Sequence, residues 1–393
     1  MKTLEGIRIL DLSQALSGPF CTMQLADHGA EVIKVEAPDG GDITRKWLPQ
    51  IHGKSAYFTT HNRNKKSITL DLRVPEGKKV FLNLVETADV VVDNYRGGTM
   101  QKYGLTHDVL KEVNPKIITA SISGYGNWGP TSKRPAFGIT IEAESGFMDL
   151  TGFPDGAPVK SGNSVADILT GTFAAYAICM ALYRREKTGE GQSIDVSMLD
   201  TMFHAMEASP LVTYLTGEPP HRTGNRTPAG TPMDAYEASD GYCVFLAPVW
   251  TQWEALCRLM GHEELIGNPE YADYTMLKKH EEEITDWINE WSRTLTREEL
   301  GQQLGQNGIA FSYVLDVKES MNNPQIKARD MVVELDDSKM GKIQVQGIPA
   351  KMSVTPGAVE TSAPELGQDN EAIYSKIGLT EEDMKNLREK GII

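Results

Sequence analysis

The fold is decided by residues 7–36, which read IRILDLSQALSGPFCTMQLADHGAEVIKVE. Ile7–Leu12 and Glu31–Glu36 have the pattern of β-strands, and the segment between them reads as a loop entering a helix that ends at a glycine. A strand, a helix and a second strand within the first 36 residues predict a parallel βαβ unit. The first turn carries only Gly18-Pro19 instead of GxGxxG, so the sequence predicts a Rossmann-like α/β architecture in which NAD binding has no support.

Further strands extend this pattern along the chain. Residues 75–87 predict a helix that starts at a proline, and the apolar runs 88–95 and 116–123 predict strands that end in polar or glycine-rich loops. In open α/β sheets, ligands bind at the carboxyl ends of the strands. Basic and amide side chains lie near several of these ends and favour an anionic, nucleotide-like ligand: Arg45, Lys65, Lys66, Arg73, Asn94, Arg96 and Lys102.

The second half of the chain has a different character. Residues 215–235 are rich in Gly, Pro, Thr and Arg and indicate a linker. A strand at 242–247 and amphipathic helices over 250–306 predict a smaller α+β domain, and 330–393 predicts short strands and a final charged helix.

Composition limits the function classes. The 393 residues are 40% hydrophobic and 24% charged, which is typical of a globular protein of about two domains. A formal charge of −15 argues against nucleic acid as a partner. The four cysteines form no CxxC pair and have apolar neighbours, so we expect buried free thiols in a reducing compartment. Without a signal-peptide pattern, a membrane-length apolar run or a histidine cluster, the sequence predicts a cytoplasmic protein that binds neither membrane nor metal.

One carboxylate, Asp167, lies within residues 161–182, where a small polar turn meets an almost uncharged run of helical length. Asp is a favoured helix N-cap, which would make Asp167 structural. It could equally be a reactive carboxylate that the dipole of a buried helix keeps ionised. The local sequence leaves both interpretations open.

The wider pattern resembles the family III CoA-transferases, the CaiB/BaiF-like group that includes formyl-CoA transferase and carnitine CoA-transferase. The resemblance covers nearly the whole chain. It rests on the order and spacing of several landmarks: Gly18-Pro19, Gly29–Glu36, Gly41–Arg45, Asn64–Ile68, Ala88–Asn94, Ser123–Gly126, Asp167 and Thr188–Gln192.

The resemblance implies an interlocked homodimer of two ring-like subunits. Each subunit would have a large Rossmann-like domain, residues 1–200, completed by 330–393. A linker at 201–224 would lead to a small α+β domain at 225–325, and residues 326–393 would return to the large domain. The implied partners are an acyl-CoA and a small carboxylic acid.

The resemblance also implies the chemistry. Asp167 would attack an acyl-CoA thioester, form an aspartyl-acyl anhydride and then an aspartyl-CoA thioester, and pass CoA to the acceptor acid. Coenzyme A would be a co-substrate, and no metal is implied. The candidate CoA contacts are Arg45, Leu70, Asp71, Leu72, Arg73, Asn94, Tyr95, Arg96 and Lys102.

Four residues are candidates for the acyl pocket: Leu16, Trp47, Phe137 and Gly138. Leu16 replaces a glutamine of formyl-CoA transferase, so we expect an acyl group larger or less polar than formyl. Gly138 stands where many members carry an acidic residue, for which Glu142 or Glu144 could compensate. One alternative is the racemase branch, which acts on 2-methylacyl-CoA, but its members have a histidine where this chain has Phe137, which disfavours it. The other is a catalytically silent CoA-binding protein, which Asp167 disfavours and the missing acidic residue at Gly138 keeps open.

Overall fold

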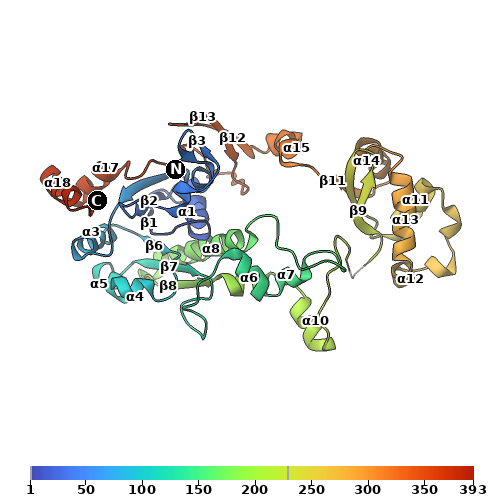
Figure 1. Cartoon of the computed structure of the whole chain (residues 1–393), viewed down its shortest axis with the longest axis horizontal. Helices are drawn as coiled ribbons and strands as arrows, with labels where there is room; N and C mark the ends of the chain where they lie inside the picture. Colours follow the sequence, from blue (N-terminus) through green and yellow to red (C-terminus); the bar gives the residue numbers. More distant parts are fainter. Residues whose placement is uncertain (1, 228–229) are drawn as a thin grey trace. The chain divides into compact units, whose positions relative to one another are not determined.

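A computed structural model describes residues 2–227 and 230–393 (Figure 1). The chain divides into two compact units. The first comprises the chain up to Met148 together with Lys160–Tyr214 and Pro324–Ile393, and the second comprises Asp149–Val159 and Leu215–Asn323.

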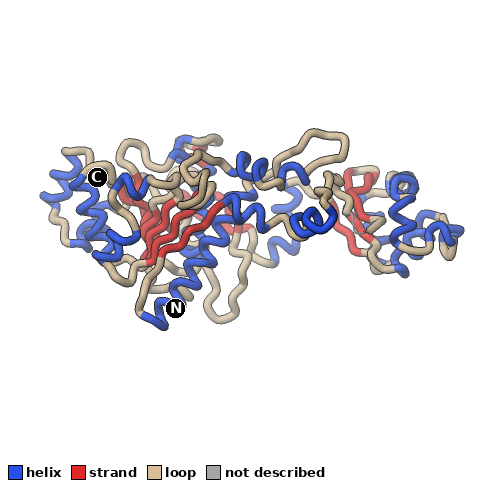
Figure 2. The backbone as a smooth tube through the Cα atoms, turned by 90° about the horizontal axis from the view of Figure 1, so that it is seen from below, coloured by secondary structure: helices blue, strands red, loops and turns tan. Residues whose placement is uncertain are grey.

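The first unit is built on a six-stranded sheet in which every neighbouring pair is parallel (Figure 2). From one edge the order is β5-β2-β1-β6-β7-β8, which is 3-2-1-4-5-6 in chain order. The order therefore reverses between β1 and β6, where open α/β sheets form a ligand crevice. The strands are β1 (Arg8–Asp11), β2 (Glu31–Glu36), β5 (Lys65–Thr69), β6 (Val90–Asp93), β7 (Ile118–Ser123) and β8 (Ser193–Ser197).

The predicted βαβ unit is confirmed. Helix α1 (Ser17–Asp27) joins β1 to β2, which pair in parallel from Arg8 opposite Glu31. Helices cover both faces of the sheet, which explains why central strands such as β6 are apolar along their length.

Each face has its own core. On one face Leu10 and Val91 pack with α3 (Pro75–Val85), α5 (His107–Val113), α17 (Asn370–Tyr374) and α18 (Glu381–Glu389). On the other, Ile9 and Val92 pack with α1 and α8 (Val165–Thr188). A Cβ on Gly171 of α8 would lie 2.5 Å from the Ser17 carbonyl oxygen, so this glycine lets α8 approach the start of α1 closely.

Helix α8 is longer than the apolar run 168–182, because it continues through Arg184–Lys187 to Gly189 in the left-handed conformation. By length and composition it is the one helix among the described residues that could cross a membrane, which corrects the expectation of no such run. Of its most apolar window, 44% is buried inside the protein. Its outer side leaves Cys179 exposed, whereas the other three cysteines are buried free thiols as predicted.

The segment 201–224, predicted as a linker, is partly helical. Its glycine-rich part starts only at Gly217, and the apolar residues before it form α10 (Ser209–Thr216) with Pro210 in the first turn. The first unit also contains η1 (Ile43–Lys46), β3 (Gln50–Ile51), β4 (Lys54–Ser55), α2 (Ala56–Asn62), α4 (Thr99–Tyr103), α6 (Gly138–Glu144), α9 (Met198–His204), α16 (Pro324–Ala328), β12 (Val332–Asp337), β13 (Gly341–Gln346) and η4 (Ser375–Ile377); α7 (Phe147–Leu150) spans the boundary between the units.

The second unit has a three-stranded antiparallel sheet in the order β11-β10-β9. Its core gathers Trp253, Ile288 and Leu300 from the surrounding helices. Its elements are β9 (Met233–Ala238), β10 (Gly241–Leu246), α11 (Trp250–Met260), η2 (Glu263–Leu265), η3 (Pro269–Tyr271), α12 (Tyr274–Lys279), α13 (Glu281–Ser292), α14 (Arg297–Gln306), β11 (Ala310–Tyr313) and α15 (Val317–Asn322).

Strand β5 begins with two lysines in opposite environments. The Lys65 side chain is fully buried, and its Nζ lies 3.0 Å from Asp11 Oδ2. The Lys66 side chain is 41% exposed and pairs with Glu31 at 2.6 Å. The interpretation of Lys65 as a contact for an anionic ligand is therefore wrong, because its charge is neutralised inside the protein.

We expect Lys65→Met to lower the free energy of unfolding by about 3–5 kcal/mol, because it removes one partner of a buried ion pair. Lys66→Met is the matched control and should cost less than about 1 kcal/mol. Urea denaturation of both variants measures the difference, and equal losses would contradict this account of Lys65.

Candidate active site

The loop between β1 and α1 lies at the switch point of the sheet. Asn94, the first residue after β6, holds this loop through both ends of its amide: the Gln14 N–H donates to Asn94 Oδ1 at 2.8 Å, and Asn94 Nδ2 donates to the Gln14 carbonyl at 2.6 Å. The two loops that flank the switch point are thus tied together.

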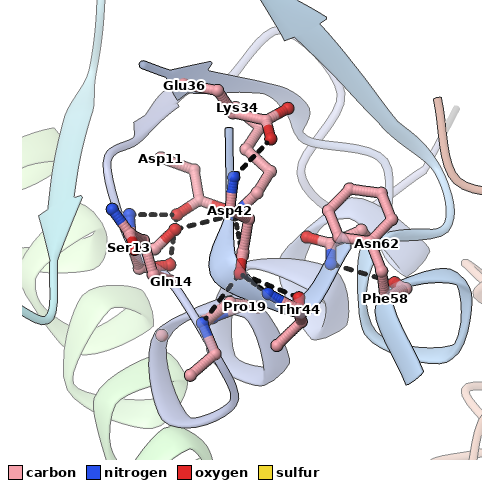
Figure 3. A network of polar contacts seen from close by, with 12 residues as sticks. Asp11, Ser13, Gln14, Pro19, Lys34, Glu36, Asp42, Thr44, Phe58 and Asn62 are labelled. Atoms are coloured by element: carbon pink, nitrogen blue, oxygen red, sulfur yellow. Dashed lines mark hydrogen bonds and ion pairs between the residues drawn. The ribbon is translucent and has the colours of Figure 1, made fainter. Parts of the chain in front are cut away.

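A buried polar network of side chains binds the backbone of the same loop (Figure 3). Lys34 Nζ lies 2.9 Å from Asp42 Oδ2 and donates to the Ser13 carbonyl at 2.7 Å. Asp42 Oδ1 accepts from the Ala15 N–H at 3.2 Å. Ala15 has φ of 62°, a left-handed conformation that costs a non-glycine residue about 1 kcal/mol or more. The network holds the loop in this strained form.

The network balances three carboxylates against three cations, namely Asp11, Glu36 and Asp42 against Lys34, Arg45 and Lys65. Burial alone would raise the pKa of Asp11, but Lys65 and Lys34 hold it well below its usual range. Burial also lowers the pKa of Lys65, to about 8 against the opposing pull of Asp11. Mutual compensation makes these buried charges tolerable.

Asp167 is the third residue of α8 and is partly buried. The N-cap residue is Ser164, so the interpretation of Asp167 as the cap is wrong. Its carboxylate instead accepts backbone hydrogen bonds at its own residue and from Ser17, the first residue of α1. The supported β1–α1 loop thus leads directly into a contact with Asp167.

Burial is the largest influence on Asp167 and raises its pKa to about 6. The charge of Glu142 raises the pKa further, while the two backbone hydrogen bonds act in the opposite direction. We expected the helix dipole to keep this carboxylate ionised. Desolvation opposes the dipole, so that the anion predominates above about pH 6 and the protonated form below it.

Gly138, the first residue of α6, lies against the Asp167 carboxylate. A Cβ at this position would be 2.4 Å from Asp167 Oδ2, far inside contact distance. Because Gly138 has no side chain, the Asp167 carboxylate packs directly against its backbone. Phe137, the preceding residue, is 68% exposed.

Aromatic rings form a row on α2 and the loop before it. The Trp47 and Tyr57 rings are 5.0 Å apart, and Tyr57 and His61 are also 5.0 Å apart. Burial and then the charge of Asp167 raise the pKa of Tyr57 to about 12, which places this phenol within electrostatic reach of Asp167. Leu16 is buried directly before Ser17. The assignment of Leu16, Trp47, Phe137 and Gly138 to an acyl pocket stays a prediction.

The predicted CoA contacts occupy three different environments. Arg45 forms a two-point ion pair with Glu36, both contacts at 2.7 Å, and Asn94 is engaged with Gln14 as described above. Leu70 and Leu72 belong to one apolar cluster, against which Tyr95 packs. The remaining four side chains are exposed or half-buried. Asp71 and Arg73 form an ion pair at 2.8 Å, and Arg96 and Lys102 are exposed.

Tyr95 and Arg96 also line a cavity of about 340 Å³ at this end of the sheet, together with Asp93 and Ser121. Burial raises the pKa of Asp93 to about 7. The binding of CoA by the nine predicted contact residues stays a prediction. No cluster of three or more potential metal ligands occurs among residues 2–227 and 230–393.

Sequence reasoning missed the residues that position the site, above all Lys34, Asp42 and Tyr57. For Lys34 a signal existed, because a charged residue flanked by Ile33 and Val35 in the middle of a strand is buried only when it is paired. Tyr57 carried no such signal, since its proximity to Asp167 arises from the packing of separate segments.

The fold and the site define an α/β protein with a desolvated carboxylate, Asp167, that the loop at the switch point of its sheet contacts. The chain belongs to CoA-transferase family III, whose model matches residues 4–370. It is 36% identical to the succinyl-CoA–D-citramalate CoA-transferase of Chloroflexus aurantiacus, over 100% of this chain and 98% of that protein. It is also 36% identical to the formyl-CoA:oxalate CoA-transferase of Streptomyces coelicolor, over 100% and 99%.

Solved structures support the same family assignment. A CaiB/BaiF family protein from Brucella suis superposes with a TM-score of 0.87 at 34% identity, covering 96% of this chain and 99% of that one. The predicted family and the prediction of an enzyme that transfers CoA are confirmed.

Asp167→Asn should stabilise the free protein. The folded pKa of about 6 exceeds the ordinary value of 3.8, so folding disfavours the charged form, and stability falls as pH rises from about 4 to about 6. Asparagine removes that penalty, with an expected gain of about 2 kcal/mol at pH 8 that vanishes below pH 4. Thermal melts across this range measure it, and a constant difference at every pH would refute the assignment.

Gly138→Ala should lower the transferase rate by about 100-fold, because the new methyl group must displace the Asp167 carboxylate. Gly162→Ala is the control, since a Cβ there meets nothing within 4 Å. Steady-state rates with matched melting temperatures test this; similar rates for both variants would show that the Gly138 contact is unimportant.

Proposed function

We propose that the protein moves CoA from an acyl-CoA thioester to a carboxylic acid with Asp167 as the nucleophile. The observation that carries this is the Asp167 carboxylate itself, which is partly buried, raised in pKa, packed against the backbone of Gly138 and bonded by Ser17 in the loop at the switch point of the sheet. Desolvation makes a carboxylate more reactive, because less hydration must be lost when it attacks.

The reaction proceeds by exchange at three carbonyl carbons, those of the donor, of Asp167 and of the acceptor. An Asp167 oxygen attacks the thioester carbonyl, the C–S bond breaks, and CoA leaves as a thiolate with an aspartyl-acyl anhydride left behind. The thiolate attacks the Asp167 carbonyl, which releases the donor acid and forms an aspartyl-CoA thioester. The acceptor carboxylate attacks this thioester, which releases the thiolate and forms a second anhydride. The thiolate then attacks the acceptor carbonyl of that anhydride, which gives the acceptor CoA thioester and regenerates the Asp167 carboxylate.

Each attack develops negative charge on a carbonyl oxygen, which fixed N–H donors can stabilise. The backbone N–H groups of Ser17 and Asp167, which both bond the Asp167 carboxylate, support this role. The racemase alternative needs a second base beside Asp167 for two-base proton exchange, and Phe137-Gly138 supply none.

In this proposal CoA runs along the carboxyl ends of the strands. Tyr95, Arg96 and Lys102 would bind it from one side and Leu70–Arg73 from the other. Arg45 and Asn94 would support the CoA site indirectly, because their polar groups already bind Glu36 and Gln14.

The proposed donor is a dicarboxylic acyl-CoA such as succinyl-CoA. Relatives named for succinyl-CoA with citramalate or mesaconate, and one named for succinate and glutarate, share 34–36% identity with this chain. Leu16 in place of glutamine speaks against formyl-CoA, even though formyl-CoA:oxalate relatives are equally similar.

We further propose that the large unit is Rossmann-like and that two chains form an interlocked ring-like homodimer. The strand order 3-2-1-4-5-6 supports the first point. An exposed apolar stripe on α8 supports the second, since Phe173, Tyr176, Met180 and Tyr183 recur at helical spacing and are 38–68% exposed.

The test is covalent trapping with succinyl-CoA. Hydroxylamine should convert Asp167 to its hydroxamate, detectable by peptide mass spectrometry, and release of free CoA should decline below about pH 6 as Asp167 becomes protonated. Asp167→Ala should abolish trapping and lower exchange by about 10⁴-fold or more. Asp200→Ala, an exposed acid on α9, serves as control. Undiminished exchange in Asp167→Ala would end the proposal.

A further inference from the structure

Helix α6 carries a second carboxylate, Glu142, one turn after Gly138. Residues four apart share one face of a helix, so Gly138 and Glu142 both face the beginning of α8. Glu142 is only 1% exposed. Its neighbour Glu144 points elsewhere and bonds Tyr125 and Arg134.

The contacts of Glu142 tie it to the segment that begins α8. Its Oε2 accepts from the Ser161 N–H at 2.9 Å, and the Ser161 hydroxyl lies 3.0 Å from both carboxylate oxygens. That hydroxyl is also 2.7 Å from the Asn163 carbonyl, two residues before the first residue of α8. Glu142 therefore holds the turn that leads into α8, where Asp167 is the third residue.

The charge of Glu142 is not needed for these contacts. Among the described residues no cation lies within ion-pair distance of it, although an uncompensated buried carboxylate is costly. A glutamine could accept from the Ser161 N–H through its oxygen and donate to the Ser161 hydroxyl through its NH₂. The hydrogen bonds to Ser161 therefore do not explain why this position carries a negative charge.

We infer that Glu142 is a positioning residue for the transfer reaction, which holds the start of α8 and, through its negative charge, disfavours the free Asp167 carboxylate relative to its covalent adducts. This inference rests on the proposed function. Asp167 is anionic only in the free enzyme, whereas in the anhydride and in the CoA thioester its carbonyl is neutral. Repulsion from Glu142 thus acts on the free state alone and favours adduct formation.

The electrostatic surroundings agree with this. After burial, Glu142 is the charge that raises the pKa of Asp167. The charge of Asp167 in turn contributes, after burial, to the raised pKa of Tyr57. The titratable groups on the elements around this end of α8 are Glu142 and Glu144 on α6, Asp200 and His204 on α9, Asp195 on β8, Cys21 and Asp27 on α1, and Tyr57 and His61 on α2. The segment before α8 adds Lys160, whose ammonium donates to the carbonyl of Ser161 at 2.7 Å and not to Glu142.

The test compares E142Q with wild type, using E144Q as control. In E142Q the acid limb of CoA release from succinyl-CoA should move to lower pH, and the fraction of protein carrying the adduct should fall by the matching factor. A shift of half a pH unit corresponds to about threefold. An unchanged limb, or unequal changes in the two readouts, would overturn the inference. So would failure of E142Q to fold, because glutamine preserves the hydrogen bonds and relieves a buried charge.

A double-mutant cycle in the unliganded protein separates this inference from the proposed function. At pH 8, Asp167→Asn should raise the melting temperature more in wild type than in E142Q, because the repulsion exists only when both carboxylates are present. Equal increments would refute the coupling whether or not the protein forms adducts. Coupling without any adduct would instead refute the proposed function.

Discussion

The Lys34–Asp42 ion pair holds the loop on which the whole site depends. Lys34 rises from the middle of an apolar strand, and Asp42 comes from the loop after that strand, yet both bind the backbone between β1 and α1. That backbone includes the left-handed Ala15, which would relax without them. Because α1 follows at once, the network also determines where the Ser17 N–H meets Asp167.

The protein keeps its reactive carboxylate in an unfavourable environment. Six buried charges below the loop compensate one another, but Asp167 and Glu142 have no cation among their described contacts. In the proposed mechanism, the free energy that folding spends on desolvating Asp167 would be recovered when the carboxylate becomes a neutral covalent adduct. A site of this kind is less stable than the fold could make it, which is common where activity needs a strained or poorly solvated group.

The main elements of the large unit were predictable because they are local. Strands 7–12 and 31–36 with the helix between them follow from hydrophobic pattern and length alone, and the parallel pairing follows from the connection. Asp167 was identified through motif order. The roles of Lys65, Arg45 and Asn94 could not be assigned, since a basic or amide side chain near a strand end reads the same whether it faces a ligand or an internal partner. Helix α10, within the predicted linker 201–224, was not predicted because the neighbouring Gly and Pro residues indicated a linker.

The sequence by itself determined the α/β class and the family and predicted Asp167 as the nucleophile, because strand patterns and motif order can be recognised without knowledge of contacts. The tertiary structure alone decided that Asp167 is not a cap, that its pKa is raised, and that Gly138 and Glu142 face it. These properties depend on desolvation and on distances of a few ångströms between segments far apart in the chain. Hydrophobic pattern carries no record of such distances, since many arrangements of the same helices would bury the same apolar faces.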